Sequence, residues 1–169
     1  MSLLRPVESY ARREMTVYRR APGGPVAITR AAGSTVAVGA DGRTIEVLAD
    51  PFLAGDRLRD RLAAGVEVAL DGEVVGVLRQ SGHGVRRRER TIDFTSTAGD
   101  GQLPRSARFV ARGVTGTLAM EVDGDVVIRV RVPAVLWLNR ALRHRSGVRP
   151  EWVVLFAAVG IAVRPAALL

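Results

Sequence analysis

The sequence predicts a mainly β fold with added helix (α+β), namely a closed antiparallel β-barrel of about ten to twelve strands around a hydrophobic C-terminal helix. Between residues 14 and 132, apolar and polar residues alternate with the period of a β-strand. Asp-Gly dipeptides, which accommodate the positive φ angles of tight hairpins, separate several apolar runs. The run 152–163 is apolar throughout, and a helix that is apolar on every side must be buried on every side.

Three Asp-Gly turns predict the hairpins. The clearest lies in VEVALDGEVVGVLR, where two β-branched runs flank Asp71-Gly72. The same dipeptide recurs at 41–42 and at 123–124, with irregular spacing that does not indicate a sequence repeat. Further strands are predicted in EMTVYRR, PVAITRA, RRRERTIDFTS and SARFVAR, which brings the total to about ten.

Two segments outside these strands carry helix signals. Residues 50–65 place Leu58 and Leu62 four apart and end at Gly65, which predicts a short amphipathic helix or an ordered loop. Residues 133–147 open with a proline, carry apolar residues at helical spacing and end with basic residues before a glycine. This set of signals predicts a second helix.

The apolar run 152–163 is predicted to be the central helix, with Pro150 and Glu151 at its start and Arg164-Pro165 at its end. A helix of this length measures about 18 Å, whereas the hydrocarbon core of a bilayer is about 30 Å thick. The run therefore cannot span a membrane unaided. Strands outnumber helices, so a curved sheet is the simplest enclosure, and closure of that sheet would remove its exposed edges.

The order of these elements, together with EWVVLFAAVGIAV near the end, resembles the Tubby C-terminal-like superfamily, especially its LURP-one-related branch, which includes the phospholipid scramblases. Glu151 takes the acidic position that precedes the family's apolar helix. The resemblance covers Met15 to about Val163 and implies a closed barrel threaded by that helix. Arg164-Pro165 replaces a second acidic position, and no segment matches the calcium-binding segment of scramblases. Scramblase activity is therefore not expected.

The composition of the chain bears on the kind of partner that it binds. The chain has 169 residues, a net charge of +8 and no cysteine, and its 25 basic residues are all arginine. This bias reflects either the codon usage of a GC-rich genome or recognition of anions, because guanidinium groups bind phosphate in bidentate fashion.

We predict one domain, 1–169, with 1–13 as an N-terminal extension. The start lacks the apolar stretch of a secretory signal, which predicts a cytoplasmic protein, peripheral at the membrane where it binds lipid.

The first candidate site is a row of arginines in VRRRERTIDF. On an extended strand Arg86, Arg88 and Arg90 project to one side at intervals of about 6.6 Å. The same side continues into Ile92 and Phe94, which are expected in the core. Arginine on a core-facing row requires a wet mouth of the barrel, or a bulge that reverses the register. Such a mouth would bind phosphate or an anionic lipid headgroup; the alternative is a solvated charged strand.

The second candidate site is a patch formed by Arg143 and Arg145. The residues around it, 136–138, are apolar and include Trp137. This pattern is typical of an interfacial membrane helix, and equally of a helix that packs on a barrel and directs its last turn toward water. The sequence does not show whether this patch and the first row meet. Other basic or ionisable residues of the cluster are Arg140, His144 and Arg149.

Catalytic and metal sites are not indicated. His83 lies in the glycine-flanked loop QSGHGV and Asp93 is a candidate to orient it, but no nucleophile, base and orienting group form a set. Glu121, Asp123 and Asp125 lack the spacing of a calcium loop. We therefore expect no enzyme activity, no cofactor and no metal.

The predicted function is non-enzymatic binding of an anionic phospholipid, or a lipid-like ligand, at the membrane surface. One alternative is a nucleic-acid-binding module, which the net charge permits although aromatic residues for stacking are scarce. Another is a protein-interaction barrel without a small ligand. A hydrolase or transferase that uses His83 is the remaining alternative.

Overall fold

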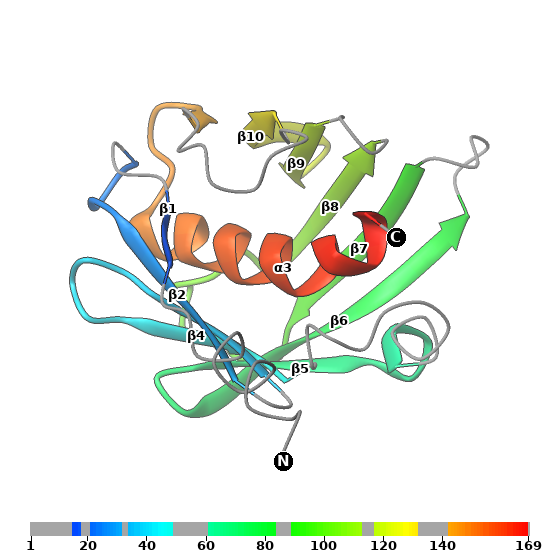
Figure 1. Cartoon of the computed structure of the whole chain (residues 1–169), viewed down its shortest axis with the longest axis horizontal. Helices are drawn as coiled ribbons and strands as arrows, with labels where there is room; N and C mark the ends of the chain where they lie inside the picture. Colours follow the sequence, from blue (N-terminus) through cyan, green and yellow to red (C-terminus); the bar gives the residue numbers. More distant parts are fainter. Residues whose placement is uncertain are drawn as a thin grey trace, which may run out of the picture.

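A single curved antiparallel sheet forms most of the described structure. The computed structural model describes residues 15–17, 21–31, 34–48, 61–83, 89–112, 117–131 and 142–168. Within these ranges every strand pairs with its neighbours in sequence order, and one long helix, α3 (Pro150–Leu168), lies on the concave side of the sheet (Figure 1). The strands are β1 Met15–Val17, β2 Val26–Ala31, β3 Ser34–Val38, β4 Thr44–Val47, β5 Val66–Leu70, β6 Glu73–His83, β7 Glu89–Ser96, β8 Ser106–Arg112, β9 Thr117–Val122, β10 Asp125–Arg131 and β11 Arg143–His144.

The predicted Asp-Gly hairpins are confirmed. Asp71-Gly72 joins β5 to β6, and both residues have positive φ angles, 50° and 89°. The turn at 123–124 joins β9 to β10 in the same way, with φ angles of 54° and 84°. At 41–42 only Gly42 has a positive φ, 85°. Local turn chemistry therefore sets the order of the strands.

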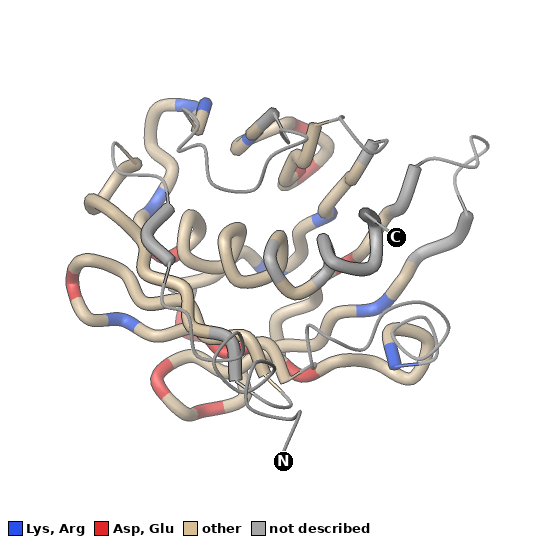
Figure 2. Tube along the Cα trace, viewed as in Figure 1, with Lys and Arg blue, Asp and Glu red and all other residues tan. Residues whose placement is uncertain are grey.

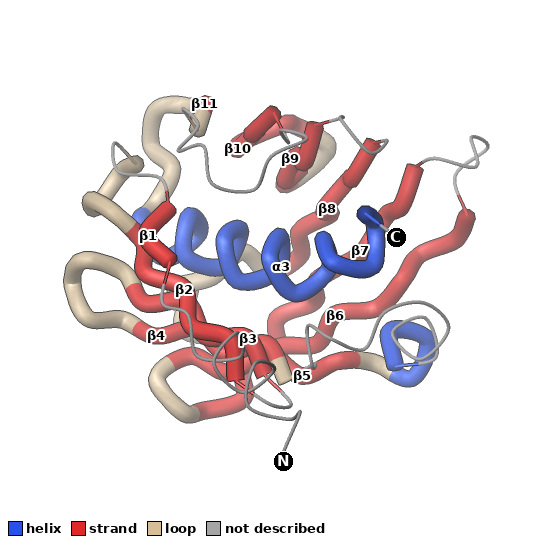
Figure 3. The backbone as a smooth tube through the Cα atoms, viewed as in Figure 1, coloured by secondary structure: helices blue, strands red, loops and turns tan. Residues whose placement is uncertain are grey.

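The sheet is open in the described part of the chain, so the predicted closed barrel is not observed there. β1 pairs only with β2, and β11 pairs only with β10 (Figure 3). Both edge strands are short, three and two residues, and offer few backbone groups for pairing with each other. The observed architecture is a mainly β fold in which an open, strongly curved sheet surrounds much of α3.

The buried apolar helix predicted at 152–163 is confirmed, although α3 is longer. From Val153 to Val159 no residue exposes more than 3% of its surface, and the ring of Phe156 lies 6.4 Å from that of Phe109 on β8. The predicted end at Arg164-Pro165 is wrong, because α3 continues to Leu168. Among the described residues, no helix is long and apolar enough to cross a bilayer.

The other two helix predictions have different outcomes. Residues 61–64 are helical and Leu62 is buried, and Gly65 follows with a φ of 103°; residues 50–60, with Leu58, lie outside the described residues. The predicted helix 133–147 is wrong in its last part. There Arg143-His144 forms β11 against β10, because an open sheet edge supplies hydrogen bonds that the local helical pattern does not reveal.

Candidate anion-binding site

Arg90 lies on the core-facing row of β7, as the sequence predicted. Ile92 and Phe94, two and four residues further along, are 2% and 0% exposed. The pairing of β7 with β8 runs without a shift from Glu89 to Thr95, so no bulge in β7 turns Arg90 to the other face. The register predicted for Arg90 is therefore observed in the described part of β7. Arg86 and Arg88 lie outside the described residues.

A bulge is present on the neighbouring strand, β6. Gln80 is paired with Ile92, and His83 with Arg90, so β6 contains one residue more than β7 over this stretch. The bulge places the backbone of His83 beside Arg90. Asp93, the sequence candidate for orienting His83, belongs to the opposite face of β7, where its Oδ1 accepts a hydrogen bond from Arg108 Nε at 3.0 Å. The Asp93 carboxylate therefore already has Arg108 as its ion-pair partner.

The row that contains Arg90 faces the C-terminal half of α3. Arg90 pairs with Ala111 of β8, and Ala111 pairs with Leu118 of β9. A Cβ atom at Gly160 of α3 would lie 2.7 Å from Leu118 Cδ2, so the helix and this row are in close contact. Arg90 thus lies at the end of the sheet toward which α3 runs.

The opposite end, at which α3 begins, is covered by the loop between β7 and β8. Trp152 Nε1 donates to the carbonyl oxygen of Gln102 at 3.1 Å, and Arg149 Nη1 donates to that of Gly101 at 2.8 Å. Arg43 Nη1 donates to Gln102 Oε1, and Arg43 Nε lies 3.9 Å from Glu151 Oε1. These contacts tie the loop to the first turn of α3.

The two arginines of the second predicted site, Arg143 and Arg145, have different surroundings. Arg145 Nη1 lies 2.8 Å from Asp125 Oδ2, so its charge is already paired. Arg143 is paired across the strands with Arg129 of β10. Arg129 and Arg143 are both exposed, and the described residues provide no carboxylate partner for either. Arg129 was missed because the pairing of β11 with β10 was not predicted, although the alternation along β10 already placed it on the solvent face.

Arg90 and Arg143, one described member of each predicted site, do not lie on the same face of the sheet. Arg90 belongs to the concave face of β7, whereas Arg129 and Arg143 lie on the convex face of β10 and β11. Charged residues lie on the strands and turns around α3, and the described middle of the helix carries none (Figure 2). The described arginines therefore lie on separate parts of the sheet.

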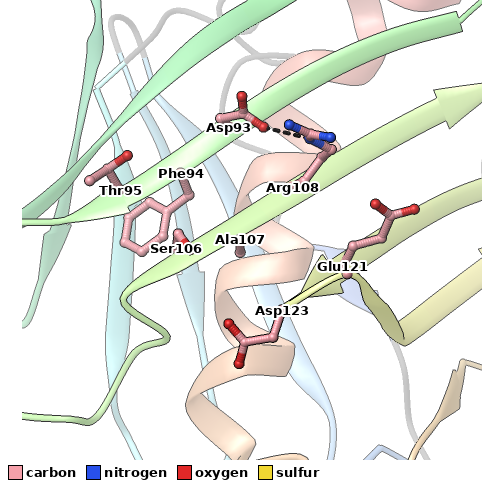
Figure 4. Close-up of a pocket in the computed structure, with 9 residues that line it drawn as sticks. Asp93, Phe94, Thr95, Ser106, Ala107, Arg108, Glu121 and Asp123 are labelled. Carbon is pink, nitrogen blue, oxygen red and sulfur yellow. Dashed lines mark hydrogen bonds and ion pairs between the residues drawn. The ribbon is translucent and has the colours of Figure 1, made fainter.

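The convex face also carries a hollow of about 400 Å³ over β7, β8 and β9 (Figure 4). Cross-strand pairing brings Asp93, Arg108 and Glu121 into one row of alternating charge. The hydrogen bond and the charge of Asp93 raise the pKa of Arg108 above its ordinary value, and the charge of Glu121 adds to this effect. The lining residues are Asp93, Phe94, Thr95, Ser106, Ala107, Arg108, Glu121, Asp123 and Gly124.

The chemistry of this hollow does not suit an anion. Three carboxylates face one guanidinium group, and Arg108 already binds Asp93. Opposite charges on adjacent strands stabilise a sheet face without any ligand. Within the described ranges no group of three or more metal-ligating side chains is close enough to hold a metal ion. Sequence reasoning missed this row because it depends on the register between three strands.

Comparison of the chain with models of known protein families, with curated proteins and with solved structures found no match. The resemblance to the Tubby C-terminal-like superfamily therefore stays a prediction from the order of the elements.

Proposed function

We propose that this chain is a non-enzymatic binding protein that recognises an anionic phospholipid headgroup at the end of the curved sheet where Arg90 lies. The observation that carries the proposal is the position of Arg90 on the same row as the buried Ile92 and Phe94. A guanidinium group in such a row needs a counter-anion or water, because an unpaired charge in an apolar environment is costly. A phosphate group meets this need through short, charge-assisted hydrogen bonds.

Net charge and surface arrangement support a membrane as the source of the anion. A chain with a charge of +8 is attracted to an anionic surface, and each arginine near such a surface contributes about 1 kcal/mol. Arg129 and Arg143, which have no carboxylate partner among the described residues, supply two cations on the convex face. The proposal does not require a closed barrel, because the proposed site involves only β6, β7 and β8, which pair with one another. It implies a peripheral protein on the cytoplasmic side of a membrane.

Vesicle binding tests this function. The chain should float with phosphatidylcholine vesicles that contain phosphatidylglycerol and not with phosphatidylcholine alone, and added salt should weaken the binding. Arg90→Gln should lower the affinity about tenfold, which corresponds to roughly 1.4 kcal/mol for a charge-assisted hydrogen bond. The matched control is Arg79→Gln, which removes the same charge from an exposed position on the convex face of β6. The affinity of the Arg79→Gln variant for the anionic vesicles should fall much less.

Two results would contradict the proposal. Equal losses in the Arg90→Gln and Arg79→Gln variants would mean that only total charge matters. Failure to bind either kind of vesicle would show that the chain does not recognise a phospholipid. In that case a gel shift with an oligonucleotide at low salt, sensitive to Arg90→Gln, would favour the nucleic-acid alternative.

A further inference from the structure

Four Asp-Gly dipeptides occur in the chain, at 41–42, 71–72, 100–101 and 123–124, and the structure describes all of them. This dipeptide is prone to a spontaneous rearrangement, because glycine has no side chain that would keep its amide nitrogen away from the aspartate carboxyl group. A hydrogen bond to either reacting group slows the reaction, since it must be broken first. The hydrogen bonds of each dipeptide therefore indicate which of the four reacts fastest.

In three of the four dipeptides the aspartate carboxylate accepts a hydrogen bond from a backbone N–H group. At 41–42 the attacking nitrogen is engaged as well, because the Gly42 N–H group donates to the carbonyl oxygen of Gly39 at 2.9 Å. Both groups that would react are therefore held in place there. The three backbone donors are those of Arg43 to Asp41 at 3.1 Å, Thr44 to Asp71 at 2.8 Å and Gln102 to Asp100 at 3.2 Å.

The surroundings of Asp123-Gly124 are different. Both residues are exposed, and the part of the chain that the structure describes offers no hydrogen-bond or ion-pair partner to the Asp123 carboxylate or to the Gly124 N–H group. The dipeptide fills a two-residue turn, since Val122 and Asp125 on either side of it are paired. The carboxyl group can thus turn toward the Gly124 nitrogen without breaking a hydrogen bond to the described protein.

We propose that Asp123 is a site of spontaneous covalent modification, at which aspartate rearranges to isoaspartate. The Gly124 nitrogen attacks Cγ of the protonated Asp123 carboxyl group. A bond forms between nitrogen and Cγ, the carboxyl hydroxyl group leaves with the proton of the nitrogen as water, and a five-membered cyclic imide results. Water then opens the imide: cleavage between nitrogen and Cγ restores aspartate, and cleavage between nitrogen and the α-carbonyl carbon gives isoaspartate. The net change is an isomerisation that needs no reactant besides water.

The product alters the turn and the hollow beside it. In isoaspartate the main chain runs through the former side chain, so the turn gains one backbone carbon atom. A two-residue turn fixes the register of its hairpin, and Val122 and Asp125 close this one. Asp123 and Gly124 also line the hollow over β7, β8 and β9 (Figure 4). The modification therefore changes the hairpin of β9 and β10 and one wall of the hollow.

The experiment follows all four dipeptides in one sample. The folded chain is kept in neutral buffer for increasing times and digested, and an isoaspartate-specific methyltransferase labels the peptides, which mass spectrometry identifies. Isoaspartate should accumulate at Asp123 about twofold to tenfold faster than at Asp71 or Asp100, the factor expected when one hydrogen bond must be broken before the attack. At Asp41, where two hydrogen bonds must break, it should accumulate most slowly.

The unfolded chain is the control for local sequence. Concentrated urea removes the hydrogen bonds of the fold, so the four dipeptides should then convert at rates within about twofold of one another, less than the effect of one hydrogen bond. The same lead of Asp123 in urea would assign the difference to the neighbouring residues and overturn the structural explanation. Faster conversion of another dipeptide in the folded chain would overturn the assignment to Asp123.

A matched pair of variants supplies a second measurement. Asparagine before glycine forms the same imide with loss of ammonia, so Asp123→Asn and Asp71→Asn each report the reaction as a change of mass. The folded Asp123→Asn variant should lose ammonia about twofold to tenfold faster than Asp71→Asn, because the side-chain oxygen at 71 still accepts from the Thr44 N–H group. Equal rates in the two folded variants would contradict the proposal.

Discussion

At the scale of single residues, the packing of the sheet depends on how closely Phe94 of β7 lies against β6. Gly76 of β6 lies against the ring: a Cβ atom there would be 2.3 Å from Phe94 Cε2 and 2.7 Å from the carbonyl oxygen of Thr95. Phe94 is fully buried and the second contact is backbone, so neither neighbour can move cheaply. The absence of a side chain at Gly76 is therefore a requirement of the packing.

Gly76→Ala should destabilise the fold by about 1–3 kcal/mol, the usual cost of overpacking a core. The matched control is Gly99→Ala, because a Cβ atom at Gly99 would meet nothing within 4 Å and should change stability by less than about 0.5 kcal/mol. Chemical denaturation of both variants measures the difference. Equal midpoints for the two variants would show that Phe94 can move aside.

At the scale of elements, features set by residues close together in the sequence were predictable, whereas features set by pairing between strands were not. The hairpins at 71–72 and 123–124 were predictable because the dipeptide itself accommodates the turn. The position of Arg90 was predictable because alternation along one strand is local. β11 was not, since two residues become a strand only when β10 offers its edge. The bulge that places His83 opposite Arg90 depends in the same way on the pairing of β6 with β7.

The central position of α3 gives the prediction for this scale. Val154 is 3% exposed, and its Cγ2 would lie 3.1 Å from a Cβ atom at Gly39. Val154→Asp should leave the chain insoluble or without fixed tertiary packing, because an unpaired buried charge costs several kcal/mol. Val74→Asp introduces the same charge at a site that is 48% exposed and should be tolerated. Near-ultraviolet circular dichroism compares the two, and a native spectrum for Val154→Asp would contradict the buried helix.

At the scale of the whole molecule, the loop between β7 and β8 ties one end of the sheet to its helix, and Arg90 lies toward the other end. The contacts of Arg43, Arg149 and Trp152 fasten the loop between β7 and β8 to the start of α3. Because of this difference we propose the second end as the binding site, with the arginines of the convex face adding a longer-range attraction to a charged surface.

Arg129 and Arg143 provide the test of that longer-range role. Like charges directly opposite each other on adjacent strands destabilise a sheet, so changing both to Gln should leave the melting temperature unchanged or raise it. The same change should weaken binding to anionic vesicles and flatten its salt dependence, because fewer cations take part in the attraction. Arg145→Gln is the control: its charge is already paired with Asp125, so its effect on binding should be smaller. Vesicle affinity at low and at physiological salt, measured beside thermal unfolding, separates the two contributions. If Arg145→Gln weakened binding as much as the double variant did, the unpaired state of Arg129 and Arg143 would have no special role.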